Sequence, residues 1–315
     1  MRDHDQRLRA IAGHVVEKGG TAAASDTGGA AVELSHGLAM PAVGYGAALF
    51  GLKKGFDFAQ FPSSDDPGSM AGDDAIEALV GDVLDAGYRH LDTAHCYHTE
   101  LPIGRALASR FASGQLSRSD VWVTTKTSDP ILSTNSYMRN AEESSYYGVL
   151  DEFAGCLERL GLEYVDTLLL HWPGDKESEN ESLQNRKRAG MWRALEVIYA
   201  NGQARSIGVS NFTPRHLEPL LAGCSIVPHV NQIECHTRQQ QLELVDYCRA
   251  LGIVITAYSP ISGSDLEDPI LQRLAAVHSV GAGDVVLRWL RQRGIVAIPK
   301  SVTPSRIASN LSGAE

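Results

Sequence analysis

Short runs of apolar and β-branched residues recur along most of the chain, and polar or amphipathic segments separate them. Runs of this length, bounded by turn-forming residues, are typical of buried β-strands. The sequence predicts eight such strands, at Ala42–Gly46, Arg89–Thr93, Val121–Lys126, Val165–Trp172, Ser206–Ser210, His229–Glu234, Ile253–Ser259 and Ile295–Lys300.

Amphipathic helices are predicted between most of these strands. In residues 74–86 the apolar positions repeat at the i, i+3, i+4, i+7, i+8 spacing of one helix face. A looser stripe runs through 238–251, where Gly252 follows as a stop signal. Three further glycines end predicted helices in the same way: Gly161, Gly202 and Gly294.

The alternation of strands and helices implies a parallel sheet with helical crossovers. Eight strand–helix units favour a single-domain (β/α)8 TIM barrel over a doubly wound sheet. A doubly wound dinucleotide fold carries G-x-G-x-x-G after its first strand. Here residues 44–49 read Gly-Tyr-Gly-Ala-Ala-Leu, without the third glycine. The barrel is therefore the predicted fold.

The chain length is distributed unevenly around this barrel. We expect residues 1–32 to form a flexible N-terminal extension and residues 33–315 to form the barrel, with insertions near 51–72 and 128–146. The eighth strand ends near Lys300, 15 residues before the last residue. Only a short helix at 304–310 fits there, so we expect the last outer helix and the C-terminal tail to be missing.

Composition excludes several classes of protein. Of the 315 residues 43% are hydrophobic and 21% are charged, which suits a globular core. The net charge of −10 argues against a nucleic-acid partner, which needs a basic surface. No apolar run is long enough to span a membrane. The five scattered cysteines form no C-x-x-C pair, which argues against a disulfide framework or a structural zinc site. We expect a cytosolic protein without membrane partners.

Polar residues gather where the predicted strands end, which in a (β/α)8 barrel is the active-site face. Asp92, Tyr97, Lys126 and His171 would surround one cavity there. Taken singly, each is equally explained by a salt bridge or a helix cap. Together they offer a proton donor, Tyr97, beside a cation that favours its phenolate. His171 could hold a substrate oxygen, so carbonyl reduction with a hydride from a nicotinamide fits this set.

Five motifs in a fixed order carry a resemblance to a known family. They are G-Y-R-H-L-D-T-A…Y…E at 87–100, V-T-T-K at 123–126, L-L-H-W-P at 169–173, G-V-S-N-F at 208–212 and I-P-K-S-V-T-P-S-R-I-x-x-N at 298–310. From about Val32 to Leu311 the chain resembles the aldo-keto reductases. The resemblance implies a (β/α)8 barrel and NADPH-dependent reduction of aldehydes and ketones to alcohols.

The resemblance also implies roles for individual residues. The family's catalytic tetrad falls on Asp92, Tyr97, Lys126 and His171, with Tyr97 as general acid. His171 and Trp172 would contact the substrate, a small carbonyl compound. The implied contacts to NADPH/NADP+ are Ser210, Asn211, Gln232, Tyr258, Ser259, Lys300, Ser301, Val302, Thr303, Arg306 and Asn310. Among these, Lys300 and Arg306 would favour the 2′-phosphate, since two fixed cations attract a dianion.

Several features depart from the family's pattern or stay outside it. The usual G-x-G-T-W at the first strand reads Gly-Tyr-Gly-Ala-Ala at 44–48, so a pocket tryptophan is lost. The segment after Tyr258 reaches its next helix near Asp268, so a short loop is expected over the cofactor. We expect no metal, because the family uses none, and we expect Cys96 to be a buried, inert thiol.

Two alternatives to the enzyme remain open at this point. One is a nicotinamide-binding regulatory or sensor protein on the same barrel, and the other is a truncated, inactive relative. The intact tetrad favours the enzyme over both. We expect a monomer, with contact to a partner through an uncovered side of the barrel as the alternative.

Overall fold

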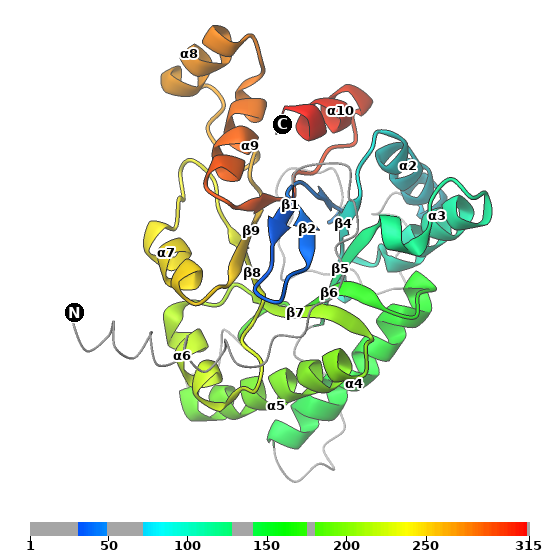
Figure 1. Ribbon diagram of the computed structural model, residues 1–315, viewed down its shortest axis with the longest axis vertical. Helices are drawn as coiled ribbons and strands as arrows, with labels where there is room; N and C mark the ends of the chain where they lie inside the picture. Colours follow the sequence, from blue (N-terminus) through cyan, green and yellow to red (C-terminus); the bar gives the residue numbers. More distant parts are fainter. Residues whose placement is uncertain (1–30, 49–71, 128–140, 175–179, 314–315) are drawn as a thin grey trace.

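Eight parallel strands form the central sheet in the computed structural model, which describes residues 31–48, 72–127, 141–174 and 180–313. Neighbours along the chain are also neighbours in the sheet, and helices surround it (Figure 1). The strands are β3 (Tyr45–Gly46), β4 (His90–Asp92), β5 (Trp122–Thr127), β6 (Val165–Leu170), β7 (Ala204–Ser210), β8 (Val230–Glu234), β9 (Val254–Tyr258) and β10 (Val296–Ala297). All eight predicted strands are thereby confirmed.

The first and last strands of the sheet meet, which closes it into a barrel. The backbone N–H of Gly44 donates to the carbonyl of Ala297 at 2.8 Å, and that of Gly46 donates to the carbonyl of Pro299 at 3.0 Å. A Cβ at position 46 would lie 3.0 Å from the carbonyl oxygen of Ile298. The absence of a side chain at Gly46 therefore permits the close approach of the two strands.

Helices cover the outside of the barrel between successive strands (Figure 1). Gly252 adopts φ +71°, which agrees with its predicted role as a stop signal. Within the described residues no single helix is long and apolar enough to cross a membrane; α8 and α9 reach that length and composition only as a pair, bent by 91°. The α-helices are α2 (Asp73–Asp85), α3 (Glu100–Ala112), α4 (Ala141–Leu160), α5 (Glu181–Ala200), α6 (Pro214–Gly223), α7 (Leu242–Ala250), α8 (Pro269–His278), α9 (Ala282–Gln292) and α10 (Pro304–Ser312), with short 3-10 helices η2 (His95–Tyr97) and η3 (Arg118–Asp120).

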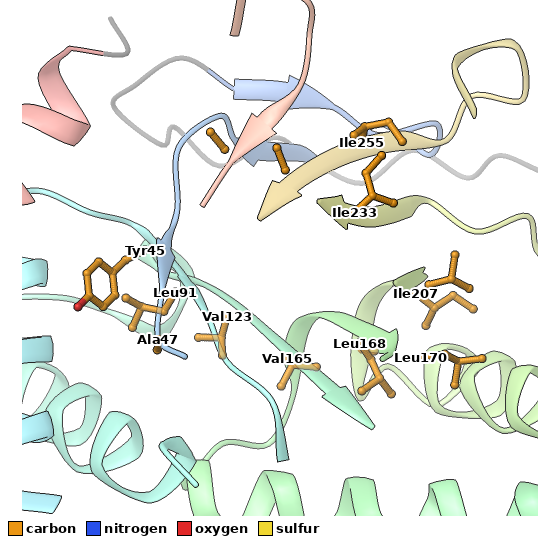
Figure 2. Close-up of a cluster of buried hydrophobic side chains, with 14 of the residues drawn as sticks. Tyr45, Ala47, Leu91, Val123, Val165, Leu168, Leu170, Ile207, Ile233 and Ile255 are labelled. Atoms are coloured by element: carbon orange, nitrogen blue, oxygen red, sulfur yellow. The ribbon is translucent and has the colours of Figure 1, made fainter. Parts of the chain in front are cut away.

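The main hydrophobic core lies between the sheet and the helices. Leu91, Val123, Leu168 and Ile207 come from four neighbouring strands and are fully buried in one cluster with helix residues (Figure 2). Side chains alternate along a strand, so the residues next to these apolar ones face the barrel interior. Many of the interior residues are polar, which places hydrogen-bonding groups inside the ring of strands.

A β-hairpin that the hydrophobic pattern did not predict lies across one end of the barrel (Figure 1). Its strands, β1 (Ala31–Glu33) and β2 (Ala39–Pro41), pair antiparallel. The buried hairpin residues Leu34, Leu38 and Met40 pack with barrel residues, among them Trp122, Leu169, Val230 and Val296. Trp122, Val230 and Val296 are the first residues of their strands. The hairpin therefore covers the end of the barrel at which the strands begin. Of the expected extension 1–32, residues 31 and 32 lie in this hairpin and the rest lies outside the described residues.

The last described segment forms the short helix that the sequence predicts. The predicted short helix forms as α10 and runs two residues further than expected, beside α9 (Figure 1). Ile307 and Asn310 are buried, and the Tyr88 hydroxyl donates to the carbonyl of Ile307 at 3.1 Å. These contacts anchor the nine-residue helix against the barrel.

The two predicted insertions lie largely outside the described residues. Residues 49–71 and 128–140 belong to that part of the chain. The end of the second predicted insertion, 141–146, forms the first turns of α4. The helix expected near Asp268 begins at Pro269, with the Asp268 carboxylate accepting from the backbone N–H of Ile270 at 2.7 Å.

We predict that Met40→Ala destabilises the barrel. Met40 is fully buried beneath the hairpin, so its truncation removes apolar contacts and leaves a cavity. The free energy of unfolding, measured by chemical denaturation, should fall by about 2–4 kcal/mol. Val277→Ala, at a side chain that is 70% exposed, is the matched control and should change it by less than about 0.5 kcal/mol. Equal effects in both variants would show that the hairpin does not contribute to the core.

Candidate active site

A buried ion pair stands at the centre of the candidate site. Lys126 of β5 donates through Nζ to Oδ1 of Asp92 at 2.6 Å and to the backbone carbonyl of Thr93 at 2.8 Å. Both charged side chains are almost completely buried. In the parallel pairing of β4 and β5, Asp92 lies opposite Thr124, which is two residues before Lys126. Asp92 and Lys126 therefore point to the same inner face of the barrel, and the register of the two strands brings their side chains together.

Gln232 of β8 completes the surroundings of the carboxylate from the far side of the barrel. Its Nε2 donates to Oδ2 of Asp92 at 2.7 Å. Each carboxylate oxygen then accepts a hydrogen bond, which is what a buried charge requires. The Oε1 atom of Gln232 forms no hydrogen bond with the described residues.

Tyr97 and His171 meet beside this pair. The Tyr97 hydroxyl lies 3.3 Å from Nε2 of His171, and Lys126 Nζ lies 4.8 Å from the centre of the Tyr97 ring. Tyr97 is the last residue of the short helix η2, which follows the C-terminal end of β4. The structure therefore brings together all four residues of the predicted tetrad, which come from four separate segments of the chain.

The electrostatic direction at Tyr97 differs from the sequence expectation. Lys126 was expected to favour the phenolate, but burial, the Asp92 carboxylate and Cys96 raise the pKa of Tyr97 well above its usual value. The main physical reason is burial, which leaves the phenolate poorly solvated, while the Lys126 ammonium is paired with Asp92. In this structure Tyr97 is a protonated phenol at neutral pH, which is the form that a proton donor needs.

His171 is held in its neutral form. Burial and the nearby Lys126 ammonium lower the pKa of His171 well below its usual value. Its Nδ1 lies 3.4 Å from Sγ of Cys96, on the side opposite Tyr97. The half-exposed Trp172 stacks on the His171 ring, with centroids 6.1 Å apart and planes 19° apart. Trp172 therefore stands beside the tetrad histidine.

The residues implied for the nicotinamide end form a connected network beside the tetrad. Asn211 Nδ2 donates to the carbonyl of His171 at 3.0 Å, and the Tyr258 hydroxyl donates to Asn211 Oδ1 at 2.9 Å. The Ser210 hydroxyl donates to the carbonyl of Gln232 at 2.9 Å. Asn211 and Ser259 adopt φ values of +66° and +51°. Left-handed backbone at residues other than glycine is costly and collects at binding sites.

The residues implied for the adenosine end lie between β10 and the start of α10. Lys300 and Arg306 are exposed, and neither forms an ion pair with any described residue. Thr303 precedes α10, and its backbone N–H donates to Ser301 Oγ at 3.1 Å. Val302 is exposed and Asn310 is buried. Two unpaired cations thus stand beside the positive end of a helix dipole.

A second buried charge pair was not identified from the sequence. Glu100 begins α3, and its side chain is completely buried with hydrogen bonds to both carboxylate oxygens. Thr125 Oγ1 donates to Oε1 at 2.6 Å, and Arg159 Nε of α4 donates to Oε2 at 2.7 Å. The pair forms only because folding brings α4 beside the start of α3. The sequence around Arg159, Cys-Leu-Glu-Arg-Leu at 156–160, does not indicate that its arginine pairs with Glu100.

The same cluster contains His95 and Cys156, whose donor atoms lie within 4.8 Å of one another and of a Glu100 oxygen. Arg159 Nη2 lies 2.7 Å from His95 Nδ1 and donates to Cys156 Sγ at 3.4 Å. One guanidinium therefore contacts all three groups and forms an ion pair with the Glu100 carboxylate. These contacts make the cluster an ion-pair and hydrogen-bond network.

Comparisons with known proteins point to one family. A model of the Aldo/keto reductase family matches residues 43–315. The chain is 39% identical to the 9,11-endoperoxide prostaglandin H2 reductase of Trypanosoma cruzi over 73% of each chain, and 38% identical to the glyoxal reductase of Bacillus subtilis over 76% of this chain and 77% of that one. A crystal structure of a Bombyx mori aldo-keto reductase in complex with NADP superposes with a TM-score of 0.70 at 30% identity, covering 90% of this chain and 87% of that one.

We predict that Arg159→Met destabilises the protein strongly. The substitution leaves the Glu100 carboxylate buried without its cation, a loss of about 3 kcal/mol in the free energy of unfolding. Arg249→Met removes an exposed pair with Asp246 and should cost less than about 1 kcal/mol. Chemical denaturation of both variants gives the comparison. An equal, small loss would mean that Glu100 does not depend on Arg159.

Proposed function

Because the chain belongs to the aldo/keto reductase family, we propose that it reduces aldehydes and ketones to alcohols with NADPH, using Tyr97 as the proton donor. The observation that supports this most directly is the meeting of Tyr97, His171 and the Lys126–Asp92 pair at one point of the barrel mouth. The glyoxal reductase and NADP-bound relatives point in the same direction. We propose a small carbonyl compound as the substrate.

The polar groups present suit a nicotinamide cofactor. The amide oxygens of Asn211 and Gln232 and the Ser210 hydroxyl are the donors and acceptors that a carboxamide needs. Tyr258 supplies an aromatic ring beside them, and Ser259 follows it with a strained backbone. When bound, NADPH supplies the hydride. These residues would hold its nicotinamide end against the tetrad.

The adenosine end would lie along 300–310. Lys300 and Arg306 have no ion-pair partner among the described residues, so both charges are available to a ligand. A 2′-phosphate carries the double negative charge that two cations and a helix N-terminus favour. The same segment contains the other implied contacts, Ser301, Val302, Thr303 and Asn310. We propose that Lys300 and Arg306 select NADPH over NADH.

The chain's own residues would move one proton. The carbonyl oxygen of the substrate accepts hydrogen bonds from the Tyr97 hydroxyl and from Nε2–H of His171, which orient it. As negative charge develops on that oxygen, Tyr97 transfers its proton to it. The phenolate that remains lies near Lys126, and solvent returns the proton. Asp92 keeps the ammonium in place through its 2.6 Å hydrogen bond.

We predict that Tyr97→Phe abolishes turnover. The ring remains, but the proton donor is lost, so kcat should fall by at least about 100-fold. The Kd for NADPH should stay within about twofold because Tyr97 lies outside the proposed phosphate and carboxamide contacts. Loss of NADPH absorbance with a reactive aromatic aldehyde measures kcat, and fluorescence titration measures Kd. Wild-type turnover in the variant would refute the role of Tyr97. Tight NADPH binding without turnover in the wild type would favour a sensor.

We predict that Arg306→Gln weakens NADPH binding selectively. A charge-assisted hydrogen bond contributes about 1.5–3 kcal/mol, so the Kd for NADPH should rise roughly 10- to 100-fold. The Kd for NADH should change by less than about twofold, since NADH lacks the 2′-phosphate. The exposed Arg249→Gln serves as the charge-matched control. A parallel loss of affinity for both cofactors would contradict the selective role.

A further inference from the structure

Cys96 and Tyr97, adjacent in the sequence, contact the two ring nitrogens of one histidine. Cys96 Sγ lies 3.4 Å from Nδ1 of His171, and Tyr97 Oη lies 3.3 Å from Nε2. Both residues belong to the short helix η2, which directs them to opposite sides of the same ring. The proposed chemistry uses the Nε2 contact alone and leaves the Nδ1 contact without a role.

The Nδ1 contact matters because His171 is neutral. A neutral imidazole carries its proton on one nitrogen and accepts at the other. With the proton on Nδ1, Nε2 would accept the phenolic proton of Tyr97 and compete with the substrate for it. With the proton on Nε2, the ring donates toward the same oxygen that Tyr97 protonates. One tautomer therefore opposes the proposed proton transfer and the other assists it.

The surroundings of Nδ1 decide between the two tautomers. Cys96 Sγ is its hydrogen-bonding partner among the described residues. The backbone of His171 is fixed separately, since its N–H donates to the carbonyl of Thr127 at 2.8 Å and its carbonyl accepts from Asn211. Burial raises the pKa of the Cys96 thiol to about 12, so the sulfur keeps its proton. A protonated thiol can donate its S–H to Nδ1, while sulfur is only a weak acceptor for an N–H placed there.

We propose that Cys96 is a positioning residue for the reductase reaction, whose thiol donates to Nδ1 of His171 and thereby holds the ring proton on Nε2. The inference rests on the proposed function, because it assigns the thiol a purpose in carbonyl reduction. It also replaces the expectation that the Cys96 thiol is inert with a specific role for that thiol. The thiol acts through His171 and transfers no atom to the substrate.

The experiment compares Cys96→Val with Cys96→Thr. These side chains have nearly the same shape, and they differ in that threonine keeps a hydrogen-bond donor. Nitrogen-15 NMR of the histidine rings, with His171 assigned through His171→Gln, reports the tautomer without any turnover. We expect the Nε2–H form in the wild type and in Cys96→Thr, and a substantial share of the Nδ1–H form in Cys96→Val.

Steady-state kinetics give the second readout. The loss of one hydrogen bond predicts a fall in kcat of roughly threefold to tenfold in Cys96→Val, with the Kd for NADPH unchanged. Cys96→Thr should restore kcat to within about twofold of the wild type. Cys224→Val, at a half-buried thiol that contacts no tetrad residue, is the matched control.

Two results would overturn the inference. One is a wild-type spectrum that shows the proton on Nδ1. The other is a Cys96→Val protein whose tautomer and kcat match those of Cys96→Thr. These outcomes are separate from failure of the proposed function. A chain without reductase activity would still show the tautomer of His171, and full activity in Tyr97→Phe would refute the proton donor whatever the spectrum shows.

Discussion

The buried pair of Lys126 and Asp92 is the interaction on which the rest of the site depends. Removing two charges from water is costly, and the pair is tolerated because every carboxylate oxygen has a donor. Those donors come from β5 and from Gln232 on β8, which is 140 residues away in sequence. The barrel must therefore close with its strands in this register for the pair to form at all. The strand register that closes the barrel is therefore also the condition for the central ion pair of the site.

The two ends of the barrel serve different purposes. At the N-terminal end the β1–β2 hairpin packs Leu34, Leu38 and Met40 against the beginnings of the strands. At the other end the strands finish in charged and hydrogen-bonding groups. Alternation along each strand turns the apolar residues outward to the helices, which leaves the polar ones inside.

Burial sets the protonation states around the ion pair. Tyr97 and Cys96 keep their protons and His171 stays neutral, each because its charged form is poorly solvated inside the barrel mouth. Fixed charge is confined to the central pair, while Lys300 and Arg306 stand exposed at the edge. The net charge of −10 describes the whole surface and conceals these two local cations.

The sequence by itself determined the eight strands, the order of the barrel and the identity of the four residues at its mouth. Those features follow from local periodicity and from the positions where strands end. Only the tertiary structure decided the contacts between distant segments: the hairpin over the barrel end, the Glu100–Arg159 pair, the hydrogen bond from Tyr88 to α10, and the thiol of Cys96 on His171. The upward shift in the pKa of Tyr97 belongs to the same group, because it depends on how deeply the ring is buried and on the Asp92 and Cys96 groups beside it. A pattern along the chain records which face of an element is apolar, and it does not record which faces meet.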